Sequence, residues 1–287
     1  MAVRVVCDST AYLTPELLAR HNIALVSLSV LWANKSVLEL DITDLDAFYD
    51  ELHAMKEMPT TSQPSVGQFL EVYRPMLENG DDIVSVHLSA AISGTWQSAN
   101  QARDQLEREG YDPRRITVLD SRSAAGGLAV IALAAAGAAS AGETREEVAA
   151  AAERMANEMS FWWALDTLEF LKRGGRIGGA QALFASAMKV KPILSIDETG
   201  TIPVDKVRTQ SRALDRLVEL AEQNMPAGGR YAVQHIGALD LANDIVARCK
   251  AKFDGEPVFV NEIGPVLGVH AGRGLIGIAV MPADLIR

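Results

Sequence analysis

Cysteine is scarce in this sequence: only Cys7 and Cys249 occur among its 287 residues. A small disulfide scaffold needs several closely spaced pairs, whereas a chain of this length can bury a large core without covalent links. Two isolated thiols, one in an apolar run and one in an expected helix, are typical of a reducing compartment. The sequence therefore predicts a cytoplasmic protein without a structural disulfide.

Metal-ligand and cofactor patterns are missing as well. The five histidines show no His-Glu-x-x-His spacing, and the two cysteines lie far apart in the chain. A phosphate-binding loop of the form Gly-x-x-x-x-Gly-Lys-Ser/Thr occurs nowhere, and no dinucleotide fingerprint follows the first expected strand. We therefore expect neither a metal site nor a bound cofactor.

Positive charge is in deficit. Acidic residues outnumber basic ones by 37 to 27, the formal net charge is −10 and the pI is near 5.0. Proteins that grip a phosphate backbone present a basic face, so nucleic acid is not an expected partner.

A long, strongly apolar segment is also lacking. The N-terminal residues run directly into a strand-like segment without a basic start or a cleavage site, which argues against a signal peptide. Residues 123–142 carry no charge and are long enough to cross a bilayer, but most of them are alanine, glycine or serine. This composition favours a helix packed closely against neighbours, so we expect no membrane insertion.

What the sequence does contain is an alternation of apolar runs with helix-start signals. Runs rich in β-branched residues, which favour strands, occur at 3–7, 83–88 and 116–119. Between them, Thr14 followed by proline predicts a helix start, and capping boxes begin at Ser65 and Thr144. Strand–helix alternation predicts an α/β fold with parallel sheets that helices cover on both faces.

The pattern of expected strands and helices changes near residue 160. Further strands are expected at 162–165, 192–196, 202–207, 231–236, 258–263 and 275–281, with helices near 211–224 and 239–253. Gly200, late in a short polar loop, predicts a hairpin between two of these strands. We therefore predict two α/β domains, residues 1–160 and residues 161–287.

Two polar segments lie beside expected strands in the first half. Thr61 and Ser62 belong to a run of small polar residues that ends at the helix start Ser65. Ser93 and Thr95 follow a strand directly, in the kind of turn that aims free backbone N–H groups at an anion. Ordinary capping by Ser65 and Ser93 explains both segments as well as a binding role does.

Two further segments combine glycine with cations or histidine. A short expected helix ends in Lys172, Arg173 and Arg176 beside paired glycines. Helix C-capping explains this pattern, but three clustered cations in an acidic chain also suit an anionic group. His270 lies among four glycines, which let the backbone approach a ligand, and imidazole can donate a hydrogen bond to a carboxylate.

Taken together, these segments resemble the motifs of the bacterial DegV family. The shared motifs are Asp8-Ser9, residues 61–65, Ser93-Gly94-Thr95 with Ser98-Ala99, residues 171–177, and residues 263–272 with His270-Ala271-Gly272. Their order and spacing are kept from residue 3 to about residue 280, and five motifs in order are far more specific than one.

The resemblance implies two α/β domains of the EDD type with a lipid site between them, in a lipid-binding protein without catalytic residues. In many bacteria such proteins are the binding subunit of fatty acid kinase. They present the carboxylate of a bound long-chain fatty acid to a separate kinase subunit that uses ATP. Carried over by motif, the carboxylate site comprises Thr61 and Ser93, with Arg173 and His270 nearby and Ser62 and Thr95 as weaker candidates.

The chain departs from the family pattern in two places. Arg273 replaces the proline of the usual His-Ala-Gly-Pro-Gly, and the usual Tyr-x-Asp-Gly pattern is absent between Asn34 and Asp41.

Two other functions remain open: a lipid hydrolase or acyltransferase that uses Ser93 and His270, and a carrier of another anionic amphiphile without a kinase. No interface pattern stands out, so a monomer is expected.

Overall fold

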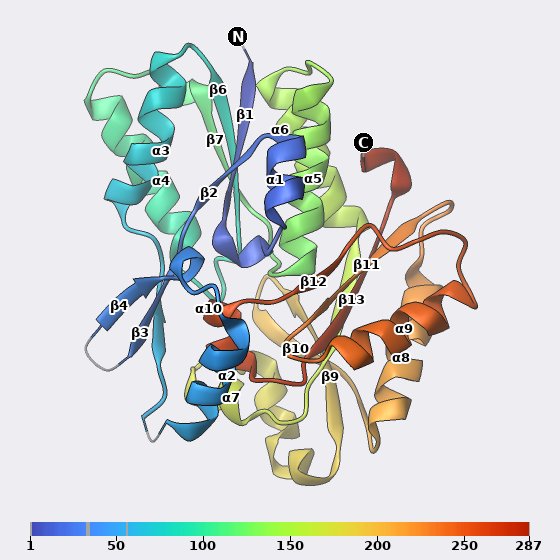
Figure 1. Ribbon diagram of the computed structural model, residues 1–287. Coiled ribbons are helices and arrows are strands. Elements are labelled where there is room, and N and C mark those ends of the chain that lie inside the picture. The colour runs from blue at the N-terminus through green and yellow to red at the C-terminus, as the bar shows by residue number, and fades with distance from the viewer. Residues whose placement is uncertain (1, 33–34, 56, 287) are drawn as a thin grey trace.

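The expected α/β fold is confirmed. The structure, a computed structural model, describes residues 2–32, 35–55 and 57–286, without the side chains of 53, 54 and 184–189. Its strands form a four-stranded, a six-stranded and a three-stranded sheet (Figure 1). All strands of the four-stranded sheet come from before residue 121, and all strands of the six-stranded sheet come from residue 160 onward. The division into two domains at residue 160 stays a prediction.

The four-stranded sheet is parallel throughout. Its strands, in spatial order, are β2 (Ile23–Val26), β1 (Val3–Asp8), β6 (Asp82–His87) and β7 (Ile116–Asp120). On one face lie α1 (Pro15–His21), α5 (Gly126–Ser140) and α6 (Arg145–Glu158), and on the other lie α3 (Val66–Glu78) and α4 (Thr95–Arg108) (Figure 1). Alternate residues of β1 face opposite ways: Val5 and Cys7 pack against α5, and Val6 packs against α3 and α4. Both faces of this sheet are therefore filled.

The predicted helix starts are confirmed. The Thr14 side chain accepts a hydrogen bond from the Leu17 N–H at 3.3 Å, and both capping boxes, at Ser65 and Thr144, are formed. These caps satisfy N–H groups that have no partner within their helix.

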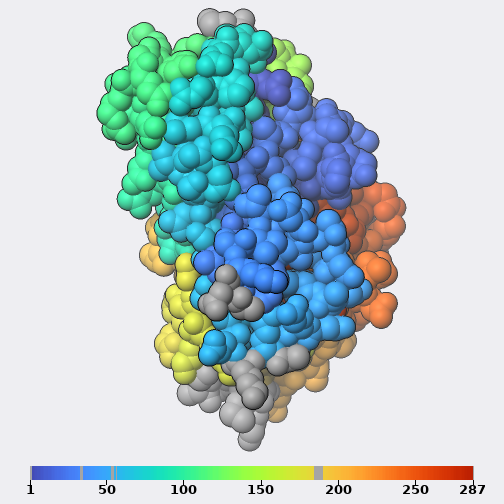
Figure 2. Space-filling view, turned by 60° about the vertical axis from the view of Figure 1, so that its left-hand side comes forward, coloured from blue at the N-terminus to red at the C-terminus, as the bar shows by residue number. Residues whose placement is uncertain are grey.

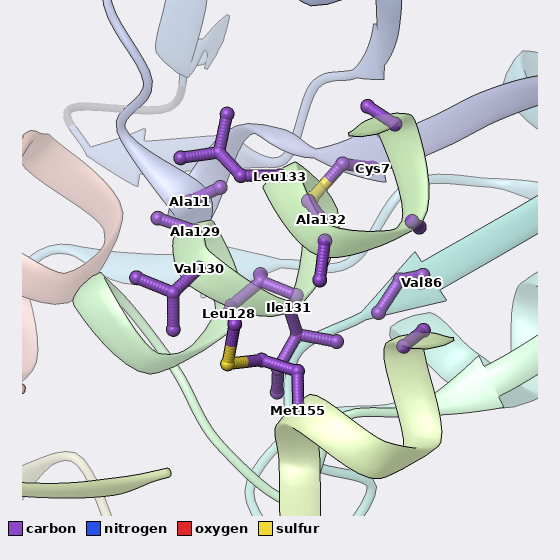
Figure 3. Close-up of a cluster of buried hydrophobic side chains, with 14 of the residues drawn as sticks. Cys7, Ala11, Val86, Leu128, Ala129, Val130, Ile131, Ala132, Leu133 and Met155 are labelled. Atoms are coloured by element: carbon purple, nitrogen blue, oxygen red, sulfur yellow. The ribbon is translucent and has the colours of Figure 1, made fainter. Parts of the chain in front are cut away.

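Helix α5 packs as closely as its small residues suggest. Every residue from Gly126 to Ala138 is buried. In Figure 3, Leu128 and Ile131 point toward Met155 of α6, and Ala129 lies beside Ala11. No helix in the described part of the chain is long and apolar enough to cross a membrane.

The six-stranded sheet, which lies in the second half of the chain, is largely antiparallel. Its spatial order is β10 (Gly200–Val207), β9 (Lys191–Asp197), β8 (Ser160–Ala164), β13 (Ile276–Met281), β11 (Arg230–His235) and β12 (Val260–Glu262). Only β11 and β12 pair in parallel. The predicted hairpin joins β9 to β10, and Gly200 there has a φ of +106°, which glycine adopts without strain. Helices α8 (Gln210–Asn224) and α9 (Leu239–Lys250) cover one face.

The three-stranded sheet was not predicted. The strands β4 (Lys35–Leu38), β3 (Ser29–Trp32) and β5 (Thr60–Ser62) pair antiparallel, and η2 (Glu39–Asp41) and α2 (Leu45–Ala54) lie between β4 and β5. This segment spreads over one side of the molecule (Figure 2) and packs against α10 (Pro265–Ala271). The Tyr49 hydroxyl donates to the carbonyl oxygens of Ile263 and Gly264, at 2.7 and 3.0 Å. Early and late parts of the chain therefore share one core.

Glu39 is buried at this junction, with 4% of its surface exposed. Its carboxylate accepts hydrogen bonds from the Tyr12 hydroxyl at 2.8 Å, the Val266 N–H at 2.7 Å, and the Ser9 hydroxyl. Burial raises the pKa of Glu39 to about 7, against these hydrogen bonds, which lower it. Glu39 belongs to the segment that departs from the family pattern, of which Asn34 lies outside the described residues.

The remaining short elements are η1 (Ser9–Ala11), η3 (Pro113–Arg115), α7 (Glu169–Arg173), η4 (Gly178–Lys189) and η5 (Ala283–Leu285). Of these, α7 and the turn after it lie next to α10 and bring their basic residues to the same side of the molecule as β5.

Candidate functional site

A cavity of about 110 Å³ lies where the two halves of the chain meet. This is far more space than the roughly 15 Å³ that one water molecule requires. Its apolar walls include Leu28, Leu88, Ala124, Ala125, Phe161, Trp163, Ala232, Ile263, Val266, Leu267, Ile278 and Ala279. Four polar lining residues, Thr61, Ser93, Arg176 and His270, form the polar end of the cavity, because Thr61 contacts His270 and Arg176 bonds to the carbonyl of Ile92, the neighbour of Ser93. Gln63, Thr201 and Gln234 also line the space.

The floor of the cavity is the face of the six-stranded sheet that α8 and α9 leave free. Strand register places Trp163 opposite Gly277, and Gly277 opposite Gln234. The next inward-facing row is Phe161, Ala279 and Ala232. Because glycine and alanine occupy the centre of this face, large side chains do not fill it, and an apolar space remains above it.

Thr61 and His270 are brought together from opposite ends of the chain. Thr61 lies on β5 and His270 on α10, and Thr61 Oγ1 is 2.8 Å from His270 Nε2. Burial, with a smaller effect of the nearby Arg176, lowers the pKa of His270 to about 4, so its imidazole is neutral at pH 7. If Nε2 carries the proton and donates to Thr61, the Thr61 hydroxyl hydrogen remains available to a ligand.

The other nitrogen of His270 is confined. Its Nδ1 is buried without a hydrogen-bond partner in the described structure. A Cβ added at Gly174 would lie 2.2 Å from this nitrogen, so only glycine fits at that turn. The Gly174 backbone thus holds the imidazole against Thr61.

Ser93 and Thr95 lie in the turn before α4. Their hydroxyl oxygens are 2.9 Å apart, and Ser93 Oγ accepts from the Thr95 N–H at 3.3 Å. Ser93 lines the cavity, whereas Thr95 is buried behind it. The Ser62 hydroxyl donates to the Gln63 carbonyl at 3.1 Å and does not line the cavity.

The two arginines of the same motif have different positions. Arg173 pairs with Glu169 on the surface of α7, with both side chains more than half exposed, and it does not line the cavity. Arg176 does line it, and its guanidinium donates to the carbonyls of Gly174 at 2.7 Å and Ile92 at 3.2 Å. Within the described residues, no carboxylate pairs with Arg176. The family motif placed Arg173 near the carboxylate site, whereas in the structure Arg176 lines the cavity and Arg173 does not.

Arg273 lies away from the polar end of the cavity. Its guanidinium pairs with Asp46 at 2.8 Å and Asp50 at 2.9 Å, both on α2, and lies 5.6 Å from the centre of the Tyr49 ring. The residue that replaces the family's proline therefore holds α2 against the loop after α10.

A lipid hydrolase that used Ser93 and His270 would need these two side chains within hydrogen-bond reach of each other. Ser93 Oγ bonds to Thr95 and His270 Nε2 bonds to Thr61, so the described residues contain no Ser93–His270 hydrogen bond. No group of three or more His, Cys, Asp or Glu side chains that could hold a metal ion is found among the residues described.

Comparison with known proteins gives one family. The family model described as uncharacterised proteins of the DegV family matches residues 2–283. A DegV domain-containing protein of Streptomyces coelicolor is 41% identical over 283 residues, which cover 97% of this chain and 98% of that protein.

Solved structures are similar over almost the whole chain. A DegV family protein of Thermus thermophilus, described as binding fatty acid, has a TM-score of 0.88 at 31% identity and covers 98% of this chain and 99% of its own. DegV of Bacillus subtilis, described as a fatty acid binding protein, has a TM-score of 0.87 at 33% identity with the same coverage.

Proposed function

The chain belongs to the DegV family, and from this membership and its cavity we propose that it binds one long-chain fatty acid. The observation that supports this most directly is the division of the cavity into a polar end and an apolar remainder. A fatty acid has the same division, because a single carboxylate heads a chain of methylenes.

The carboxylate of the ligand lies at the polar end. The hydroxyls of Thr61 and Ser93 donate to it, and Arg176, rather than Arg173, supplies the positive charge. His270, which is neutral, holds the Thr61 hydroxyl in place. Hydrogen bonds from a guanidinium to a carboxylate are about twice as strong as those between neutral groups.

The acyl chain lies over Gly277, Ala279 and Ala232, between the predicted domains 1–160 and 161–287. Each methylene removed from water contributes roughly 0.8 kcal/mol, so the apolar wall supplies most of the affinity.

The bound acid is the substrate of a separate kinase subunit. Arg176 and Gln63, at the polar end, are exposed, so a carboxylate held there is open to a partner. A carboxylate oxygen would attack the terminal phosphate of ATP on that partner, giving an acyl phosphate and ADP. Because ATP is supplied in the cytoplasm, this step places the carrier there.

Native mass spectrometry of the purified chain, followed by extraction of bound lipid, tests the proposal. We expect one fatty acid per chain. A chain that is empty and also fails to take up added fatty acid would overturn the proposal, and ester cleavage that depends on Ser93 would then favour the hydrolase.

The two arginines offer a matched pair for locating the carboxylate. In a fluorescent fatty-acid displacement assay, Arg176→Gln, Thr61→Ala and Ser93→Ala should each weaken binding by about 1–3 kcal/mol, because each removes a hydrogen-bond donor to the carboxylate. Arg173→Gln removes the same charge outside the cavity and should bind normally. The reverse order of the two arginine variants would contradict this placement.

The kinase step has its own readout. The loaded carrier, mixed with ATP and a candidate kinase subunit, should yield an acyl phosphate that hydroxylamine traps as a hydroxamate. The same chain with ATP alone should yield none, and turnover by the chain alone would contradict its role as a carrier.

A further inference from the structure

Part of the cavity wall is a seam between two segments from distant parts of the chain. The elements β3, β4, η2, α2 and β5 form one segment, here named the lid, and across the seam lies α10 with the loop that follows it. Thr61 on β5 and His270 on α10 both line the cavity, and their side chains are 2.8 Å apart. Separating the lid from α10 would therefore open the cavity at its polar end.

The lid is joined to α10 through side chains. Its strands form a sheet of their own, which in the described structure pairs with neither of the two larger sheets. Helix α2 lies directly against α10, because a Cβ added at Gly268 would lie 2.4 Å from the Tyr49 ring. The Tyr49 hydroxyl also donates to the carbonyls of Ile263 and Gly264. A small separate sheet attached in this way moves as one unit when the side-chain contacts break.

Arg273, in the loop after α10, binds the lid from the other end of this helix. Its guanidinium donates to the carboxylates of Asp46 at 2.8 Å and Asp50 at 2.9 Å, and to the Asp46 carbonyl at 3.2 Å. The side chain is held in place, since a Cβ added at Gly237 would lie 3.0 Å from Arg273 Cγ and the guanidinium lies 5.6 Å from the centre of the Tyr49 ring. A single exposed ion pair contributes little, but a fixed guanidinium shared by two carboxylates loses less entropy for each bond.

We propose that Arg273 is a latch, which holds the lid against α10 and sets the rate at which the fatty acid enters and leaves the cavity. Arg273, Asp46 and Asp50 do not line the cavity, so they stabilise the closed form equally with and without a bound acid. The latch therefore slows entry and release by the same factor. Relatives with the usual proline at this position lack the charge, so the latch is a feature of this chain. This inference rests on the proposed function and adds a control on its exchange rate.

The test is stopped-flow measurement of the binding and release of a fluorescent long-chain fatty acid by the delipidated whole chain. Arg273→Gln should raise the association and dissociation rate constants together by about fivefold and leave the dissociation constant within about twofold. The double variant Asp46→Asn, Asp50→Asn should give the same increase. Adding Arg273→Gln to that double variant should give no further increase, because all three side chains act through one contact.

Arg248 on α9 offers a matched control. It pairs with Asp215 and Asp244, and its side chain is 27% exposed, compared with 28% for Arg273. Arg248 does not line the cavity, and its partners are not in the lid. Arg248→Gln should therefore leave both rate constants unchanged.

Salt tests the latch in a second way. Raising the KCl concentration from about 0.01 M to about 1 M shortens the screening length from about 30 Å to about 3 Å. The difference in exchange rate between the unaltered protein and Arg273→Gln should therefore shrink. If Arg273→Gln exchanges at the unaltered rate, changes only the dissociation rate constant, or is matched by Arg248→Gln, the inference is overturned and the fatty-acid proposal stands. If the fatty acid binds to none of these proteins, the proposed function fails first.

Discussion

The two large sheets of this chain use their faces differently. Helices fill both faces of the four-stranded sheet with large side chains, such as Leu106 on α4 and Ile131 on α5. On the six-stranded sheet, α8 and α9 fill one face, whereas the other face packs in part against α5 and lines the cavity elsewhere. The centre of its other face carries Gly277, Ala279 and Ala232, and the cavity lies above them.

This difference separates two tasks within one chain. Closely packed cores lose stability when an atom is removed, whereas a pocket loses function when an atom is added. Removing side-chain atoms from the filled region should therefore lower stability and leave binding nearly unchanged. Adding side-chain atoms at the cavity floor should weaken binding and leave stability nearly unchanged.

The largest expected effect is in the filled region. Ile131 is 1% exposed between α5 and α6 and does not line the cavity. Ile131→Ala should lower the free energy of unfolding, measured by urea denaturation, by about 3 kcal/mol because it leaves a void. Its fatty-acid affinity should stay within about twofold. A loss of affinity as large as the loss of stability would show that the two regions are not separate.

Glu39, which accepts hydrogen bonds from Tyr12 and Val266, should make the free energy of unfolding depend on pH by a similar amount. The pKa of Glu39 is raised to about 7 in the folded protein, above its ordinary value of 4.5. The folded state therefore holds the proton more tightly, and stability falls as pH rises from about 4.5 to about 7. The expected loss is about 3 kcal/mol.

Glu39→Gln should remove this component from the curve of unfolding free energy against pH. Glu107→Gln, on the exposed side of α4, removes the same charge without burial and is the matched control. Parallel curves for the unaltered protein and Glu39→Gln would contradict the assignment.

At the cavity floor, a larger side chain should weaken binding and leave stability nearly unchanged. Ala279→Leu places a large side chain on the floor and should weaken fatty-acid binding about a hundredfold, or about 2.7 kcal/mol. Stability in the absence of ligand should change little, because the added atoms occupy open space. Ala251→Leu adds the same atoms at an exposed position and should bind normally. Full affinity in Ala279→Leu would place the acyl chain elsewhere.

The smallest effect is expected where α5 meets the cavity. Ala125 lines the cavity and has a φ of +50°, a conformation that favours glycine. Ala125→Gly should raise the free energy of unfolding by about 1 kcal/mol. Ala129→Gly, inside the helix, should lower it by at least as much. A loss of stability in both variants would mean that Ala125 is not strained.

Local features of the fold were predictable because short-range chemistry decides them. The helix starts at Thr14, Ser65 and Thr144 depend on side chains within three residues of each cap. Strands such as β1 and β6 are β-branched runs buried on both faces. The three-stranded sheet was missed because β4 and β5 are short and polar, and because the pairing of β3 with β5 joins residues about 30 positions apart.

The candidate site was also predictable only in part. Thr61, Ser93 and His270 could be selected from their motifs, but only packing shows that they line one cavity. Arg173 and Arg176 are three residues apart with similar neighbours, and the turn at Gly174 decides which one faces the cavity. Gln234 resembled an ordinary polar residue within a strand.

The sequence by itself determined the family, the alternation of strands and helices in the first half, and the residue types at the polar end. Tertiary structure alone decided the strand order of the second sheet, the pairing of Thr61 with His270, and the position of Gln234 on the cavity floor. The physical reason is that these features depend on strand register. Trp163, Gly277 and Gln234 form one row only because β8, β13 and β11, which are far apart in the chain, pair side by side.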